Sequence, residues 1–407
     1  MLQALPLVFV LIGLTLYTVL GGADLGAGFW QLGAGHSPAG ESVREYAHRA
    51  MAPVWEANHV WLVFVLTVFW TAYPGAFSSI ASTLAVPLFL ALLGLVFRGA
   101  AYALRAGAAT PRESGRIDTL FALSSIVVPF FLGTAIGAIA TDRVPVGNAA
   151  GDVWTSWLNA TSILIGVLAV ATSAHLAAVY LAADAAADHE AAIEREFRLR
   201  ALGAGVVAGA IALAGIFVVD ADNHALFESL TRGRALPAVI ASGLAGLATL
   251  GLVQLRRYEP ARYCAALAVA AVIAGWALAR WPTILPGLTV DEAAAGHDTL
   301  VCLVVAVIAG GVIIFPALAL LFRLTLAGRF RAGTHAEKAA TTTEGRPPNA
   351  RLLARLAVAC LIAGVGLLNI ADATWAHGLG VASLLSFIAF GFGAIAVPVP
   401  VENAPPG

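Results

Sequence analysis

The run "LPLVFVLIGLTLYTVLGG" (residues 5–22) is apolar over nearly the length of a bilayer, and runs like it decide the fold class. A helix needs about 20 such residues to cross the hydrocarbon core. Of the 407 residues, 60% are hydrophobic and 12% are charged, which is too little charge to hydrate a soluble protein of this size. Since backbone amides cannot stay unpaired in lipid, the sequence predicts an all-α polytopic membrane protein embedded in the lipid bilayer.

Eleven apolar runs can be marked along the chain, and they predict the domain organisation. They lie near residues 5–22, 55–73, 79–97, 119–140, 157–183, 201–219, 236–255, 263–280, 299–322, 353–371 and 378–397. The polar stretch "AGTHAEKAATTTEGRPPNA" (332–350) separates the last two runs from the other nine and is typical of a flexible linker. We therefore expect a core of about nine helices, a linker, a helical hairpin and a tail, at residues 1–325, 326–351, 352–398 and 399–407.

The basic residues predict the orientation in the membrane. Of the 23 Lys and Arg residues, 19 fall in odd-numbered loops and four in even-numbered loops. The four are Arg143, Arg232, Arg234 and Arg280; the 19 include Arg44, Arg98, Arg105, Arg195 and Arg262. Because loops rich in Lys and Arg stay in the cytoplasm, the N-terminus should lie outside and the C-terminus inside.

Two carboxylic acids stand at the edges of the first two predicted spans. Asp24 lies in "GADLGAGFW" (22–30), and Glu56 lies in "APVWEANHVW" (52–61). The predicted orientation puts both at the cytoplasmic face, joined by one loop. An acid at a membrane boundary can relay protons. It can equally be a solvated helix cap, which suits Glu56 because acids are favoured in the first turn of a helix. The spacing alone leaves both interpretations open.

Two histidines, His59 and His175, lie well inside predicted spans. Histidines on facing helices can ligate a haem, although two packed histidines that bond to neighbouring groups fit the sequence as well. Trp61 belongs to a set of tryptophans near span ends, where membrane anchoring is the usual role. The sequence has no phosphate-binding loop, HExxH motif or CxxC pair, so no metal site and no nucleic-acid binding are expected.

Six stretches resemble subunit II of the cytochrome bd-type quinol oxidases, in the same order along the chain. The first two are "GADLGAG" and "APVWEANHVWLVFVLTVFWTAYPGAF" (52–77). The other four are "FRGAAYALR" (97–105), "VVPFFLGTAIGAI" (127–139), "HLAAVYL" (175–181) and "WPTILPGLTVDEAA" (281–294). Together they cover roughly residues 1–325, and their number and order make the resemblance specific.

The chain departs from the family pattern at several positions. Ala23 stands where the family has Phe, Glu56-Ala57 replaces an Asp-Gly pair, and His59 stands where Glu or Gln is common. The two C-terminal spans have no counterpart in the basic family pattern. These departures bear on the fine geometry of a proton path.

The resemblance implies a heterodimer with subunit I in the cell membrane of a bacterium. Subunit I of the family holds haem b and haem d, and oxidises quinol on the outer side while oxygen is reduced to water. This chain would ligate no haem or metal, would support subunit I, and would line part of the routes for protons and oxygen; it could also bind a quinone.

The resemblance also gives roles to individual residues. Asp24 and Glu56 match acids that the family links to proton uptake, and Asn58, His59, Trp61 and His175 are candidate supporting residues. Two alternatives stay open, a secondary transporter and a self-contained haem protein with two histidine ligands. A transporter would favour paired broken helices in repeated halves, and no such pair is visible in the sequence.

Overall fold

The structure is a computed structural model. It describes residues 1–407 except 36–37, 52–54, 106–109, 327–347, 371–373 and 396–407. The chain forms two compact units, Met1–Ile313 and Ile314–Gly407, and each is described by itself.

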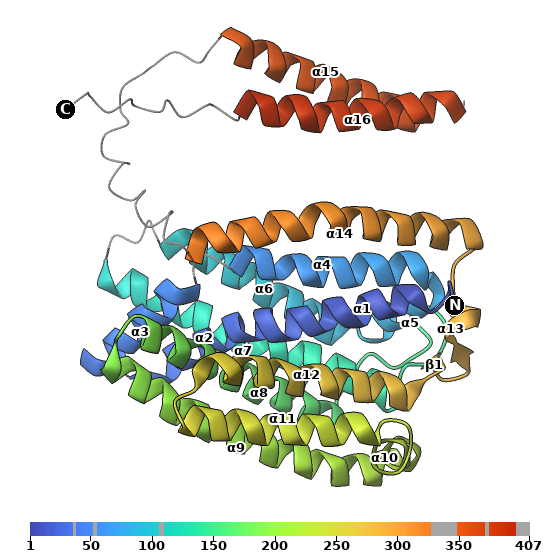
Figure 1. The fold of residues 1–407 in the computed structure, drawn as a ribbon. Helices are drawn as coiled ribbons and strands as arrows, with labels where there is room; N and C mark the ends of the chain where they lie inside the picture. The colour runs from blue at the N-terminus through green and yellow to red at the C-terminus, as the bar shows by residue number, and fades with distance from the viewer. Residues whose placement is uncertain (36–37, 52–54, 106–109, 327–347, 371–373, 396–407) are drawn as a thin grey trace, which may run out of the picture. The chain divides into compact units, whose positions relative to one another are not determined.

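The first unit is built from long helices that run side by side (Figure 1). Along the first third of the chain these are α1 Leu5–Leu16, the π-helix η1 Tyr17–Gly21, α2 Gly22–Gly33, α3 Pro38–Met51, α4 Trp55–Ala72, α5 Pro74–Thr83, α6 Ala85–Arg105 and α7 Pro111–Ala140. Then follow α8 Ala160–Ala187, α9 Ala191–Asp222, α10 His224–Thr231, α11 Leu236–Gln254, α12 Tyr258–Arg280, the antiparallel pair β1 Thr283–Leu285 and β2 Leu288–Thr289, and α13 Val290–Ala293. The last helix, α14 His297–Leu326, begins in this unit and ends beyond its boundary at Ile313.

The predicted fold class is confirmed. Among the described residues, eight helices are long and apolar enough to cross a membrane, and shorter apolar helices cover 58–72, 352–367 and 378–390. All eleven predicted spans correspond to one of these helices. Large apolar side chains such as Val206, Leu213 and Phe217 on α9 are exposed, as expected where lipid is the solvent.

The predicted end of the first span is wrong. Helices α1, η1 and α2 form one apolar helix, Leu5–Gly33, so that Asp24 lies inside a spanning helix and not after it. The glycines there serve close packing. A Cβ on Gly26 would lie 1.9 Å from the Ser173 carbonyl oxygen of α8, so this helix pair touches backbone to backbone. The third span also begins later than expected, at Ala85, because the short helix α5 precedes it.

The centre of the first unit is the packing of α2 against α7 and α8. Small residues allow the contact between α7 and α8 as well: a Cβ on Gly133 would lie 2.8 Å from the Gly166 Cα atom. This close packing holds α2, and therefore Asp24, in a buried position.

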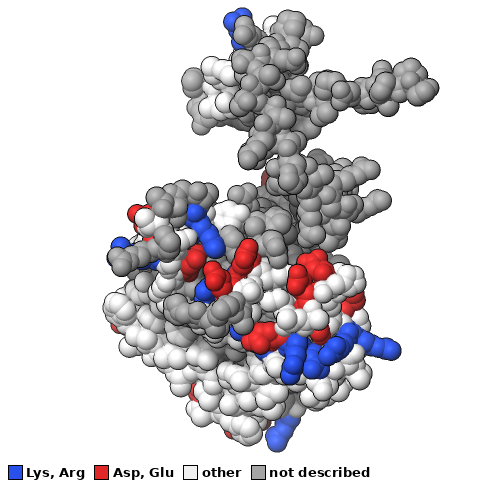
Figure 2. Space-filling model, turned by 90° about the vertical axis from the view of Figure 1, so that its left-hand side faces the viewer, with Lys and Arg blue, Asp and Glu red and all other residues white. Residues whose placement is uncertain are grey.

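Charged side chains gather at the ends of the helices. Figure 2 looks onto one end of the first unit, where acidic and basic residues lie close together. At this end Arg262 of α12 pairs with Asp184 of α8, and Arg105 lies 3.1 Å from Asp118. At the other end, Arg143 pairs with Asp222. The pairs Arg262–Asp184 and Arg143–Asp222 join helix ends from distant parts of the sequence.

The second unit contains the two C-terminal helices, α15 Pro348–Ile370 and α16 Thr374–Ile395. They form a hairpin packed through small residues: a Cβ on Gly364 would lie 2.7 Å from Leu384 Cγ and 3.0 Å from the Gly380 carbonyl oxygen. Most of the expected linker and the expected tail at 399–407 lie outside the described residues, so the predicted domain boundaries stay predictions.

Candidate functional site

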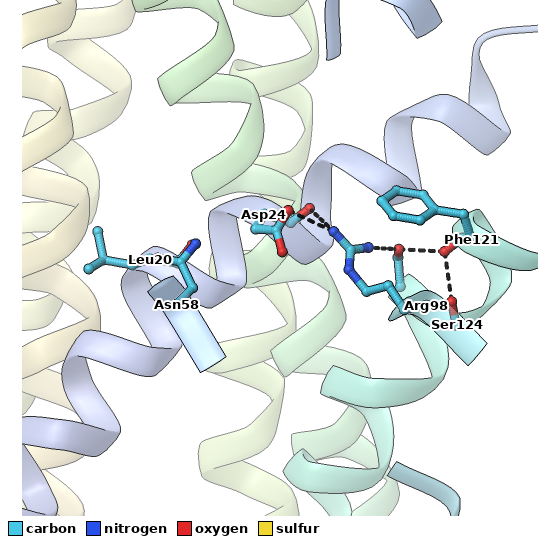
Figure 3. Close-up of polar contacts among 7 residues, drawn as sticks. Leu20, Asp24, Asn58, Arg98, Phe121 and Ser124 are labelled. Atoms are coloured by element: carbon cyan, nitrogen blue, oxygen red, sulfur yellow. Dashed lines mark hydrogen bonds and ion pairs between the residues drawn. The ribbon is translucent and has the colours of Figure 1, made fainter. Parts of the chain in front are cut away.

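Asp24 forms an ion pair with Arg98 inside the first unit. The Arg98 Nη2 atom of α6 lies 2.7 Å from Asp24 Oδ1 of α2, and each side chain is 1% exposed (Figure 3). The same nitrogen also donates to the Asp24 carbonyl oxygen at 3.2 Å. Removing one partner of such a buried pair would leave an uncompensated charge, at a cost of about 3–5 kcal/mol.

Helix α7 holds the Arg98 guanidinium in place. The Nη1 atom donates to the Ser125 hydroxyl, and this hydroxyl donates to the Phe121 carbonyl oxygen at 2.6 Å (Figure 3). The guanidinium carbon lies 4.1 Å from the centroid of the Phe121 ring, which adds a cation–π contact. Gly28 makes room for this arrangement, because a Cβ there would lie 2.1 Å from Ser125 Oγ.

The π-helix η1 lies immediately before Asp24 and contacts α4. The Asn58 Nδ2 atom donates to the Leu20 carbonyl oxygen at 3.2 Å, and Asn58 is buried. Figure 3 labels both residues, on the other side of Asp24 from Arg98. Single π-helical turns within α-helices are frequent at functional sites. Asn58 therefore links α4 to the π-helical turn that precedes α2, the helix of Asp24.

Tyr17 and His59 meet beside the same turn. Their ring centroids lie 6.4 Å apart with an interplanar angle of 71°, an edge-to-face contact between η1 and α4. The Asp24 carboxyl group interacts electrostatically with both residues. The Tyr17 hydroxyl and Asp24 Oδ2 are buried and have no hydrogen-bond partner among the residues that the structure describes.

Two further candidate residues, Glu56 and Trp61, lie on α4. Glu56 lies in the first turn of α4, and its side chain is outside the described part of the chain. Its proximity to Asp24 therefore stays a prediction. Trp61 is partly buried on α4, and its ring packs edge-on against Phe64 at 6.4 Å, which suits the anchoring interpretation.

His175 lies in a different environment from His59. Its Nδ1 atom is 2.9 Å from the Ala201 carbonyl oxygen, and the bond joins α8 to α9. Gly205 packs against the imidazole, since a Cβ there would lie 2.7 Å from His175 Cε1. Its described contacts are those of a packed histidine. Among the described residues, no group of three His, Cys, Asp or Glu side chains could hold a metal ion.

Sequence reasoning missed Arg98 as a site residue. It was counted with the cytoplasmic loops, whereas it lies within α6 and is buried. A detectable signal exists: Arg98 precedes Arg105 by two helical turns, so it lies deeper along α6 than the basic residue that ends the helix. A second, deeper arginine requires a buried counterion, and Asp24 is an acid inside a neighbouring span.

Comparison with known proteins places the chain in a family. The sequence profile described as "Cytochrome bd terminal oxidase subunit II" matches residues 2–325. The structure of the bd oxidase from Geobacillus thermodenitrificans has a similar fold, with a TM-score of 0.63 and 23% identity over 80% of this chain and 98% of that chain.

Two proteins of Bacillus subtilis (strain 168) are similar over shorter stretches. The "Cytochrome bd ubiquinol oxidase subunit 2" is 28% identical over 151 residues, which cover 36% of this chain and 43% of that protein. The "Putative cytochrome bd menaquinol oxidase subunit II" is 27% identical over 120 residues, 29% of this chain and 33% of that protein. The aligned segments thus span less than half of each relative. Because the family profile matches most of the length of this chain, the chain belongs to the family of subunit II of the cytochrome bd terminal oxidases.

Proposed function

We propose that this chain is the second subunit of a membrane-bound quinol:oxygen oxidoreductase. It pairs with the haem-bearing subunit I in the bacterial cell membrane, and the heterodimer oxidises quinol and reduces oxygen to water. Family membership over residues 2–325 supports this proposal. So does the description of two relatives as subunits of a ubiquinol oxidase and of a putative menaquinol oxidase.

The catalytic centres belong to the partner in this proposal. Haem b and haem d lie in subunit I, and this chain supplies structural support and part of the routes for protons and oxygen. The N-terminus faces outward and the C-terminus faces the cytoplasm, as the distribution of basic residues indicates.

The observation that carries the proton role is the burial of Asp24. An ionisable residue inside a spanning helix is costly and is a functional candidate by default. We propose that Asp24 and Glu56 form the cytoplasmic mouth of a proton path. Arg98 gives Asp24 a fixed counterion, so a proton on Asp24 would leave a buried cation unpaired. An incoming proton therefore binds Asp24 only briefly and then moves on. It binds at Oδ2, because Arg98 pairs with Oδ1.

A co-purification experiment tests the partnership. The chain carries an affinity tag in a bacterial host that also encodes a candidate subunit I, and membranes are solubilised and purified on the tag. We expect a coloured complex with a haem-bearing partner and with quinol-driven oxygen consumption. Purification of this chain without any haem-bearing partner, under conditions that preserve known oxidase complexes, would contradict the proposal.

A further inference from the structure

We infer that His59 is a proton-relay residue, joined to Asp24 through ordered water held between the Tyr17 hydroxyl and Asp24 Oδ2. The inference rests on the proposed proton role of Asp24 and extends the path by one step. It assigns a chemical task to a residue that sequence reasoning gave only a supporting place.

The order of the residues along two antiparallel helices sets the direction of the path. Tyr73, just after α4, bonds to the carbonyl oxygen of Gln3 before α1, and Asn58 near the start of α4 bonds to Leu20 in η1. The two helices therefore run in opposite directions. Asp24 follows Leu20 by about one turn, toward the end where α4 begins, whereas Tyr17 precedes it.

His59 lies in the layer beyond the acids. His59 follows Asn58 along α4, and its contact with the Tyr17 ring shows that both belong to the layer on the far side of the Asn58–Leu20 bond. In the proposed orientation, Asp24 and Glu56 come first from the cytoplasm, and Tyr17 and His59 come next. A proton that moves inward from Asp24 therefore meets this pair.

Two buried side chains at this place, Tyr17 and Asp24, have unused hydrogen-bonding capacity among the described residues. Buried hydroxyl and carboxylate oxygens normally have a partner, either protein or ordered water. The Tyr17 hydroxyl and Asp24 Oδ2 have none among the described residues, and the two groups interact electrostatically. A water molecule with two to four polar neighbours suits such a place. Water between the Tyr17 hydroxyl and Asp24 Oδ2 would connect the Asp24 carboxyl group to Tyr17 and to the neighbouring His59.

The chemistry of imidazole suits a proton relay. Histidine titrates near neutral pH, and one ring nitrogen can accept a proton while the other releases one. The ring returns to its neutral form, so that one proton moves and no electrons are transferred. Among the described residues, the titratable and charged groups beside His59 include Tyr17 and Asp24 on the neighbouring helix, with Arg98 behind Asp24. Helices α1 and α5 carry no titratable side chains.

The main test uses the assembled oxidase complex and the variant His59→Gln. Quinol-driven oxygen consumption is measured from acid to alkaline pH. The pH profile of H59Q is compared with that of the unmodified complex. In H59Q the shape of this profile should change, and the rate at neutral pH should fall by about tenfold or more, since a positioned proton-transfer group contributes at least that much. His224→Gln, which removes an exposed imidazole on α10, should change neither.

A second measurement does not depend on turnover. X-ray radiolysis generates hydroxyl radicals from bound water, which oxidise the side chains beside it. Tyr17 should be labelled faster than Tyr73, another buried tyrosine, whose hydroxyl is engaged by Leu7 and Gln3. Labelling of Tyr17 no faster than that of Tyr73 overturns the water connection. If H59Q does not assemble, this measurement on the unmodified complex decides.

The outcomes separate the inference from the function on which it rests. If Asp24→Asn slows turnover while H59Q keeps the rate and pH profile of the unmodified complex, His59 has no relay role and the proposed mouth at Asp24 stands. If Asp24→Asn and Glu56→Gln both turn over at the unmodified rate, the proton role of the acids fails first. A slower H59Q complex with a changed pH profile, together with faster labelling of Tyr17 than of Tyr73, supports the full path.

Discussion

Arg98 and Asp24 are 74 residues apart in the sequence, yet their side chains meet at 2.7 Å in the interior of the first unit. The pair joins α6 to α2, and Ser125 and Phe121 of α7 hold the arginine from the other side. Such a pair gives little net stability against an apolar alternative, because both charges lose their hydration. Its presence in a lipid-embedded helix is therefore better explained by a role for the Asp24 charge.

Replacing Arg98 with leucine should destabilise the complex. The variant leaves the Asp24 carboxylate buried without its counterion, and the expected cost is about 3–5 kcal/mol. Thermal unfolding of the purified complex, followed by its haem absorbance, measures the effect. The double variant Arg98→Leu with Asp24→Asn removes both charges and should recover much of the loss. An Arg98→Leu complex as stable as the unmodified one would show that the pair carries no charge in the folded protein.

A larger side chain at Gly26 should prevent α2 from packing against α8. Even the first added carbon would lie 1.9 Å from the Ser173 carbonyl oxygen, which is backbone and cannot turn aside. Gly26→Ala should therefore cost at least the 1–3 kcal/mol typical of overpacking, seen as a lower unfolding temperature or a lost complex. Gly33→Ala is the matched control at the end of the same helix, because nothing lies within 4 Å of its added carbon. Equal unfolding temperatures of the two variants would contradict the close contact between α2 and α8.

The spans were predictable because the bilayer sets a length, and the apolar runs of this sequence meet it. The end of the first span was not, since Gly22, Gly26 and Gly28 look like a helix end in sequence but are packing contacts in the fold. Asp24 was recognisable as an acid beside an apolar run. Its pairing with Arg98 was not, because it depends on how α2, α6 and α7 pack, and no helical periodicity encodes that arrangement.

Expression of the chain without subunit I should yield a colourless and poorly stable protein. The exposed apolar residues of the helices lack their natural neighbours in that state, and the haems belong to the partner in the proposed complex. Absorbance spectra and a haem stain of the purified polypeptide check this expectation. Stoichiometric haem on the lone chain would support the alternative of a self-contained haem protein.

The C-terminal hairpin should be dispensable for assembly. The family match ends at residue 325, before α15 and α16, and these two helices pack against each other through Gly364 and Gly380. A chain ending at Gly333 should therefore still purify with subunit I and retain oxygen consumption. The yield and haem content of the truncated complex are compared with those of the full chain. Loss of the complex would show that the hairpin is part of the structural core.

The decisive prediction for the proposed function concerns the two acids. Glu56→Gln keeps the size and helix propensity of the side chain but removes its exchangeable proton, so it should slow quinol-driven oxygen consumption. Asp24→Asn should do the same. Glu56→Asp is the matched control, because it keeps the carboxyl group and restores the residue found in the family pattern; it should retain most of the rate.

Rates in these variants are normalised to haem content, which separates slow turnover from poor assembly. This matters most for Asp24→Asn, because that variant also removes the counterion of Arg98. A fully assembled Glu56→Gln complex that works at the unmodified rate wherever it is stable would reduce Glu56 to a helix-capping residue. The same result for Asp24→Asn would leave the Asp24–Arg98 pair as a purely structural link between α2 and α6. Slow turnover in both, with normal haem content, is the result that a proton path through this pair of helices requires.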